Sequence, residues 1–186
     1  MLIAERHALN ICPLRSMPRV VEETGARHLI SLVPERFAPK TPPTVDPAQH
    51  LQIPIEERIS RERAGNVPVV LAMARLLAFA RTWDRRSVVV VHCFSGISRS
   101  TAAALAMLAA LRPDDPADLL AGELRKASVT AFPSASLIAL ADEMLGRAGD
   151  LRSAVDRIGL GVRAAEGRPF GLDVEATVRR TSIEPE

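Results

Sequence analysis

The sequence predicts an α/β domain of three layers. Residues 88–91 are four consecutive valines, which is typical of a strand that is buried on both of its faces. Before this strand, residues 68–83 carry apolar side chains at helical spacing, and after it an alanine- and leucine-rich run extends from Arg99 to the breaker Pro113. A helix that leads into a buried strand, with a second helix leading away, indicates a parallel βαβ arrangement.

The other elements follow from turn residues and apolar periodicity. We expect further strands at 2–11, 28–33 and 50–55, and further helices at 16–24, 116–126, 134–145 and 149–158. The five prolines of residues 34–47 predict a surface loop. Residues 164–186 are polar with few apolar anchors, so we expect a single domain of residues 1–163 followed by a poorly packed C-terminal tail or a late extended segment.

The bulk composition is that of an ordinary globular domain. Of the 186 residues, 47% are hydrophobic and 25% are charged, which is enough apolar material for one core. The net charge of +2 does not by itself indicate nucleic-acid binding, so we expect no nucleic-acid partner. The longest apolar run, residues 67–80, is interrupted by Arg75 and is short for a membrane span, so we expect no membrane partner.

The cysteines and the N-terminal residues predict a cytoplasmic location. Two cysteines, Cys12 and Cys93, are too few for a disulfide scaffold and fit a reducing compartment. Glu5 and Arg6 stand where a secretory signal would have its apolar core. We expect Cys12 to be an inert buried thiol, with a redox role toward oxidised Cys93 as the alternative.

A polar loop of five residues separates Cys93 from Arg99 and ends where the predicted helix begins. Amides at a helix start lack intrahelical acceptors and the helix dipole is positive there, so such a loop favours an oxyanion. The loop residues, which we predict to bind the substrate, are Phe94, Ser95, Gly96, Ile97 and Ser98. Gly96 permits a sharp turn, and the planar fork of Arg99 suits phosphate. A Cys93 thiolate stabilised by the same groups is a nucleophile aimed at phosphorus.

The string from His92-Cys93 to Arg99-Ser100 resembles HC-x(5)-R-[ST], the hallmark of the cysteine-dependent protein-tyrosine and dual-specificity phosphatase superfamily. The resemblance implies the compact protein tyrosine phosphatase-like fold, a mixed central sheet flanked by helices on both faces, over roughly residues 28–148. It also implies that Cys93 is the nucleophile, that Arg99 binds the phosphate and that Ser100 assists breakdown of the intermediate. It gives His92 a supporting role at the loop backbone and the thiol, although a satisfied core histidine also fits this position.

Dephosphorylation needs a carboxylic acid that protonates the leaving oxygen. In the superfamily this acid is normally an aspartate just after a strand such as residues 50–55, and aligning that strand places Glu57 there. Glu56 is the neighbouring candidate and Asp46 is the nearest upstream aspartate, while both glutamates also fit the role of solvated charges. Ser134 replaces an asparagine that often supports the phosphate loop in dual-specificity relatives, and a serine there is also a good helix N-cap.

The function that these residues predict is the hydrolysis of phosphate monoesters, with phosphotyrosine or dual-specificity protein substrates foremost, through a cysteinyl-phosphate intermediate. The expected partner is a phosphorylated protein or a small phosphomonoester, and we expect no cofactor and no metal because no histidine, cysteine or carboxylate spacing suggests a metal site. Phe37 is the one aromatic candidate for contact with phosphotyrosine. Two alternatives stay open: a catalytically weak phosphate-binding module, favoured by the missing aspartate, and a rhodanese-like sulfurtransferase.

Overall fold

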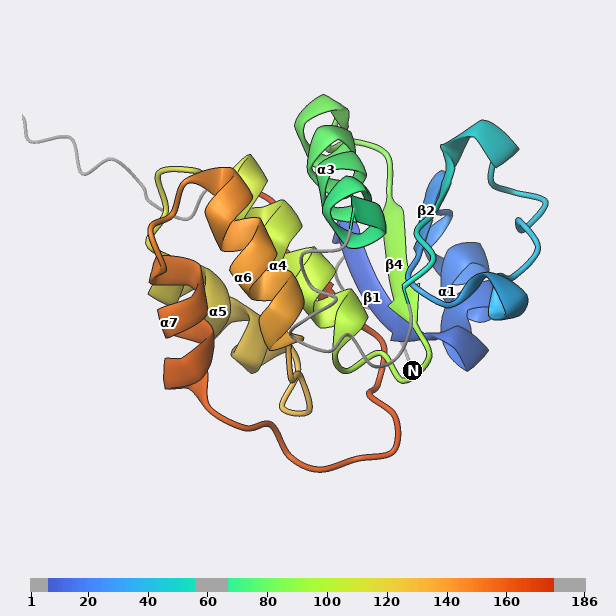
Figure 1. The fold of residues 1–186 in the computed structure, drawn as a ribbon. Helices are drawn as coiled ribbons and strands as arrows, with labels where there is room; N and C mark the ends of the chain where they lie inside the picture. Colours follow the sequence, from blue (N-terminus) through green and yellow to red (C-terminus); the bar gives the residue numbers. More distant parts are fainter. Residues whose placement is uncertain (1–6, 56–66, 176–186) are drawn as a thin grey trace, which may run out of the picture.

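A five-stranded mixed sheet forms the centre of the computed structural model, which describes residues 7–55 and 67–175. The strands are β1 (Leu9–Pro13), β2 (His28–Ser31), β3 (His50–Gln52), β4 (Val89–Cys93) and β5 (Phe170–Leu172). Their order is β3-β2-β4-β1-β5, in which β5 is antiparallel to β1 and the other neighbours are parallel. The valine run therefore forms the central strand, as predicted (Figure 1).

Helices cover both faces of this sheet and confirm the predicted layers (Figure 1). They are α1 (Met17–Thr24), α3 (Val67–Thr82), α4 (Arg99–Leu111), α5 (Ala117–Ala127), α6 (Ala135–Leu145) and α7 (Asp150–Ile158). Successive strand residues face opposite ways, so Val90 and Cys12 pack with α1 while Val91 and Ile11 pack with α3 and α4. Among the helices of the described ranges, none combines the length and apolar character that a membrane span needs.

Helix α4 is buried on nearly every side. Among its residues only Ala110 is not fully buried, and the alanine-rich sequence lets neighbouring elements approach closely. The helix contacts β4, α3, α5 and α6, so it lies between the sheet and the outer helices (Figure 1). A helix that is apolar all round belongs in a core. This packing fixes the N-terminus of α4 relative to the end of β4, which is where the polar loop connects them.

Residues 164–186, for which we expected a poorly packed tail or a late extended segment, contribute the edge strand of the sheet. β5 pairs with β1, and the side chains of Leu172 and Val174 are buried. The central sheet therefore includes residues beyond residue 163, where we expected the tail to begin. The strand signal is weak because only three alternating apolar residues stand in a polar stretch. The remaining tail residues, 176–186, lie outside the described part of the chain.

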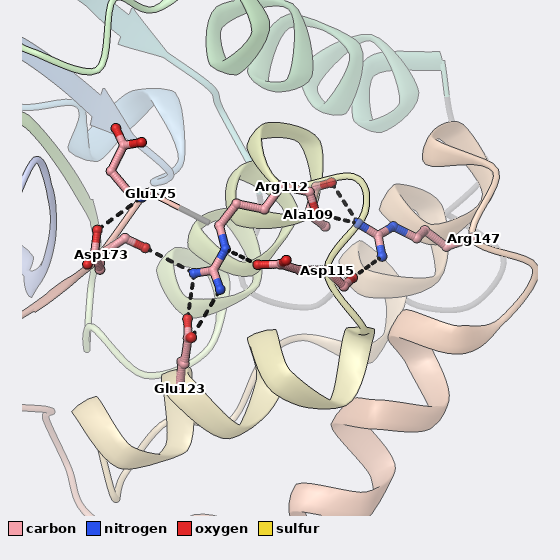
Figure 2. Close-up of polar contacts among 7 residues, drawn as sticks. All are labelled: Ala109, Arg112, Asp115, Glu123, Arg147, Asp173 and Glu175. Atoms are coloured by element: carbon pink, nitrogen blue, oxygen red, sulfur yellow. Dashed lines mark hydrogen bonds and ion pairs between the residues drawn. The ribbon is translucent and has the colours of Figure 1, made fainter. Parts of the chain in front are cut away.

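A buried ion cluster joins the C-terminal end of α4 to α5 and to the segment after β5 (Figure 2). The Arg112 guanidinium donates to Asp115 at 2.6 Å, to both carboxylate oxygens of Glu123 at 2.6 and 3.0 Å, and to the carbonyl of Asp173 at 3.3 Å. The side chains of Arg112 and Asp115 are 0% and 3% exposed. Arg147 donates to carbonyls at the end of α4, which satisfies acceptors that have no helical partner.

We predict that Arg112→Leu lowers the free energy of unfolding by about 3–5 kcal/mol, because it leaves the buried Asp115 carboxylate without its cation. Arg157→Leu is the matched control, since Arg157 also meets a carboxylate at 2.6 Å but with both side chains more than half exposed. We expect that control to cost much less, because solvent screens an exposed ion pair. Urea unfolding measures both variants, and equal losses would contradict the role of burial.

Candidate active site

The strand, loop and helix that the sequence predicts are present at the C-terminal end of β4. Cys93 is the last residue of β4, and α4 begins at Arg99. The Cys93 side chain is buried, and its Sγ lies 3.1 Å from Oγ of Ser100 in the first turn of α4. The structure therefore brings a thiol and a hydroxyl into contact at the base of the loop, with the arginine at the other end of the same loop.

The carbonyl oxygens of the loop are held from outside by backbone amides of three other segments. These bonds run from Leu14 to Phe94 (3.1 Å), from Gly167 to Ser95 (2.8 Å), from Phe132 to Ile97 (2.9 Å) and from Ser134 to Ser98 (3.3 Å). A trans peptide points its carbonyl and its amide in opposite directions. Carbonyls that are fixed outward therefore leave the loop amides facing inward.

The amides of residues 94–99 have no protein acceptor among residues 7–55 and 67–175. Such a set of unpaired donors at a helix N-terminus forms a nest for an anion. Gly96 makes the curl possible, since its φ is +69° and an added Cβ would lie 2.6 Å from the backbone nitrogen of Pro13. The five loop residues thus form one cradle, whose chemistry suits a tetrahedral oxyanion.

Arg99 is held in a fixed position beside this cradle. It is 7% exposed, and its Nη1 donates to the carbonyl of Ile55 at 2.9 Å. Its guanidinium also lies over the ring of Phe94, 5.4 Å from the ring centroid. The remaining guanidinium donors give the site a fixed cation, because arginine stays charged in proteins.

His92 lies on the opposite face of the sheet from Cys93. It is fully buried, and its Nε2 is 2.6 Å from Oγ of Ser31 in β2. Burial lowers the pKa of His92 to about 4, against an opposing effect of the Cys93 backbone. The imidazole is therefore neutral at neutral pH and acts through hydrogen bonds and not through charge.

Phe37 stands next to the loop, at 46% exposure. Its ring meets that of Phe94 edge-on, with centroids 5.0 Å apart, and the guanidinium of Arg36 lies 4.9 Å from its centroid. The proline-rich loop therefore borders the cradle and presents an aromatic surface there.

The other residues that the sequence predicts for the site are Ser134, Asp46, Glu56 and Glu57. Ser134 supports the loop through its backbone amide, since its hydroxyl makes no capping bond and meets Ser136. Asp46 caps a short 3-10 helix by accepting from the amide of Ala48. Glu57 and Glu56 lie outside the described residues. In the part of the chain that is described, no group of three or more metal-ligating side chains gathers.

Cys12 packs with α1 and therefore faces away from Cys93. Burial and the neighbouring Cys93 raise the pKa of the Cys12 thiol to about 12. This thiol is protonated at neutral pH, which agrees with the expected inert role.

Sequence reasoning missed three supports of the loop: the amide of Gly167, the carbonyl of Ile55 and the hydroxyl of Ser31. Gly167 is buried, and an added Cβ would lie 3.1 Å from the carbonyl oxygen of Gly96. Two of these supports are backbone groups, which any residue carries, so no side-chain pattern marks them. The Gly167 amide reaches the loop only when the segment before β5 folds onto it, and the Ile55 carbonyl reaches Arg99 only when the segment after β3 does.

Solved structures share this architecture. The PTP-2 phosphatase of Cydia pomonella has a TM-score of 0.57 and 17% identity, with 73% of this chain and 84% of that chain covered. The crystal structure of DUSP15 has a TM-score of 0.58 and 17% identity, covering 81% of this chain and 91% of that chain. The Yvh1 phosphatase domain of Chaetomium thermophilum has a TM-score of 0.54 and 18% identity, covering 80% and 96%. The chain has the fold of the tyrosine and dual-specificity phosphatases.

This likeness confirms the fold that the resemblance implies. No protein-family model matches the sequence. No curated protein matches it either. At such identities the shared phosphatase fold establishes the architecture, and the activity has to be argued from the cradle itself.

We predict that Gly96→Ala distorts the cradle and lowers the free energy of unfolding by about 2–4 kcal/mol, because the new Cβ meets backbone atoms and φ is positive. Vanadate affinity should fall with it, as measured by calorimetric titration. The control Gly122→Ala adds the same methyl to α5, where nothing lies within 4 Å, and should stabilise by about 0.5–1 kcal/mol. Normal vanadate binding by the Gly96 variant would refute the cradle geometry.

Proposed function

We propose that the protein is a metal-independent cysteine phosphatase, a phosphoric monoester hydrolase that works through a cysteinyl-phosphate intermediate. The observation that carries this proposal is the cradle of unpaired amides between Cys93 and Arg99. A tetrahedral phosphate carries negative charge and several acceptor oxygens, which match the inward loop amides and the guanidinium. The phosphatase fold around the cradle supports the same reaction.

In the first step, the Cys93 thiolate attacks phosphorus and an S–P bond forms as the P–O bond to the leaving group breaks. The loop amides and Arg99 stabilise the charge on the equatorial oxygens. The hydrogen bonds to the loop carbonyls fix the loop amides before the reaction, and the Ile55 carbonyl fixes Arg99, so little reorganisation is needed. The leaving oxygen takes a proton from a carboxylic acid.

In the second step, water attacks phosphorus, the S–P bond breaks, and phosphate leaves with the thiolate restored. Ser100 lies 3.1 Å from the sulfur, where its hydroxyl can donate to the departing thiolate. The same carboxylate that gave up its proton accepts one from the water. Atoms and charge balance over the two steps without an outside oxidant or reductant.

Glu57 is our candidate for this acid and base. The proposal rests on its place in the sequence, shortly after β3 and Ile55, whose carbonyl holds Arg99. Asp46 is less suited, because it already caps a short helix. A glutamate can do the same chemistry as an aspartate, and its side chain is longer by one methylene.

We propose phosphoprotein substrates, phosphotyrosine among them, with small phosphomonoesters as further substrates. The exposed ring of Phe37 beside the cradle supports this choice, because an aryl group can pack against it. The cradle loop adds no cation beyond Arg99, so it lacks the basic groups that a polyphosphorylated lipid headgroup would need. The two free cysteines support a reducing, cytoplasmic location.

We predict that Cys93→Ser abolishes turnover of an aryl phosphate and retains vanadate binding, because a serine hydroxyl is not ionised in the cradle. Cys12→Ala is the matched control and should keep wild-type turnover. Steady-state kinetics and calorimetric titration measure both. Turnover by the Cys93 variant would refute the proposal. If the wild-type protein itself binds vanadate but turns over no phosphate ester, the phosphate-binding module is favoured. If the wild-type protein forms a persulfide, the sulfurtransferase is favoured.

We predict that Glu57→Gln lowers kcat by roughly 10²–10⁴-fold for an alkyl phosphate, because the leaving alkoxide must be protonated. The loss should be much smaller for an aryl phosphate with an acidic leaving group. Glu56→Gln serves as the neighbouring control. A rate that is unchanged for both substrates would reassign the acid.

A further inference from the structure

A row of four hydrogen-bonded side chains runs from the surface loop to His92. Oγ1 of Thr41 lies 2.8 Å from Nδ1 of His50, and Nε2 of His50 lies 2.7 Å from Oγ of Ser31. The same Ser31 oxygen lies 2.6 Å from Nε2 of His92. The row crosses three strands, β3, β2 and β4, and ends on the residue before the nucleophile.

The row is part of a wider clamp on the junction between β4 and the phosphate loop. Ser31 is paired with His92 across the sheet, and the next amide, that of Leu32, donates to the His92 carbonyl at 2.9 Å. Ser31 is in turn held by β3, because the Ile53 amide donates to its carbonyl at 2.9 Å. β2 therefore fixes both the ring and the backbone of His92.

The protonation of this row follows from its surroundings. Burial lowers the pKa of both His50 and His92, so both rings are neutral at neutral pH. Arg99 and His50 further lower the pKa of His92. Cys12, which pairs with His92 from β1, stays a neutral thiol because burial raises its pKa. Within residues 7–55 and 67–175, no charged group provides a counter-ion for His92, and the ring depends on its hydrogen bonds.

A neutral row has two arrangements, which differ in the direction of every hydrogen bond. In the first, the Thr41 hydroxyl donates to Nδ1 of His50, Nε2–H of His50 donates to Ser31, and the Ser31 hydroxyl donates to Nε2 of His92. The His92 proton then sits on Nδ1. This atom has no hydrogen-bond partner among the described residues, but the Cys93 backbone raises the pKa of His92, as an acceptor near the ring does. In the reverse arrangement Nδ1 would turn a lone pair toward that backbone.

We propose that Ser31 and His50 are positioning residues for the Cys93 nucleophile, because they hold His92 as the tautomer whose Nδ1–H faces the Cys93 backbone. This inference rests on the proposed function. A donor at the Cys93 carbonyl fixes the first peptide of the loop, and the amide of Phe94 in that peptide then points into the cradle. Ser31 and His50 do not touch the substrate; they act through His92 on the amides that stabilise the thiolate.

The test is an ultraviolet titration of the Cys93 thiolate, taken as the difference between each protein and the same protein carrying Cys93→Ala. We expect Ser31→Ala to raise the titration midpoint by about one pH unit and to lower kcat/KM for an aryl phosphate about tenfold near neutral pH. His50→Leu should shift the midpoint in the same direction. His50→Gln should restore it, because the amide of glutamine can donate to Ser31 in place of the imidazole.

Ser87→Ala is the matched control. It removes a serine–histidine bond of the same kind, 2.9 Å from Ser87 to Nε2 of His28, just before β4 begins. Thermal unfolding should report a comparable loss of stability for the Ser31 and Ser87 variants, while only the Ser31 variant shifts the thiolate midpoint. A folded Ser31→Ala protein with the wild-type midpoint would overturn the proposal. The titration needs no substrate, so wild-type protein that lacks turnover would refute the proposed function and leave this result standing.

Discussion

The central constraint on this structure is that buried backbone polar groups must find partners. In the loop between β4 and α4, the carbonyls satisfy this constraint with amides of the protein, whereas the amides do not. The imbalance makes the loop an anion site in advance, because the unpaired donors gain their partners only from a ligand. The reacting sulfur and the fixed guanidinium of Arg99 stand at the two ends of that same loop.

The rest of the fold keeps this arrangement rigid. Helix α4 is enclosed by the sheet and the outer helices, and the Arg112 cluster holds its far end (Figure 2). On the other side of the loop, the segment before β5 contributes the Gly167 amide, and β5 itself ties that segment to β1. Residues distant in the sequence therefore together orient the loop amides toward the anion site.

The sequence predicts most of the elements and the chemistry at the two ends of the loop. The valine run and the alanine-rich helix are strong local signals. The helix expected at 16–24 is present as α1, which ends at Gly25 in a left-handed conformation. Prediction is weaker where tertiary contacts determine whether a strand forms and how long it is. The strands expected at 28–33 and 50–55 are shorter, and β5 rests on pairing with β1. The link from His50 through Ser31 joins three strands, which no local pattern reveals.

The most direct measurement of the central claim is the rate at which iodoacetamide alkylates Cys93 at neutral pH in the wild-type protein, with Cys93→Ala as the blank. If the inward amides and Arg99 stabilise the anion, Cys93 reacts faster than the cysteine of a short peptide, and vanadate protects it. Alkylation at the rate of the peptide cysteine, unchanged by vanadate, would contradict the account.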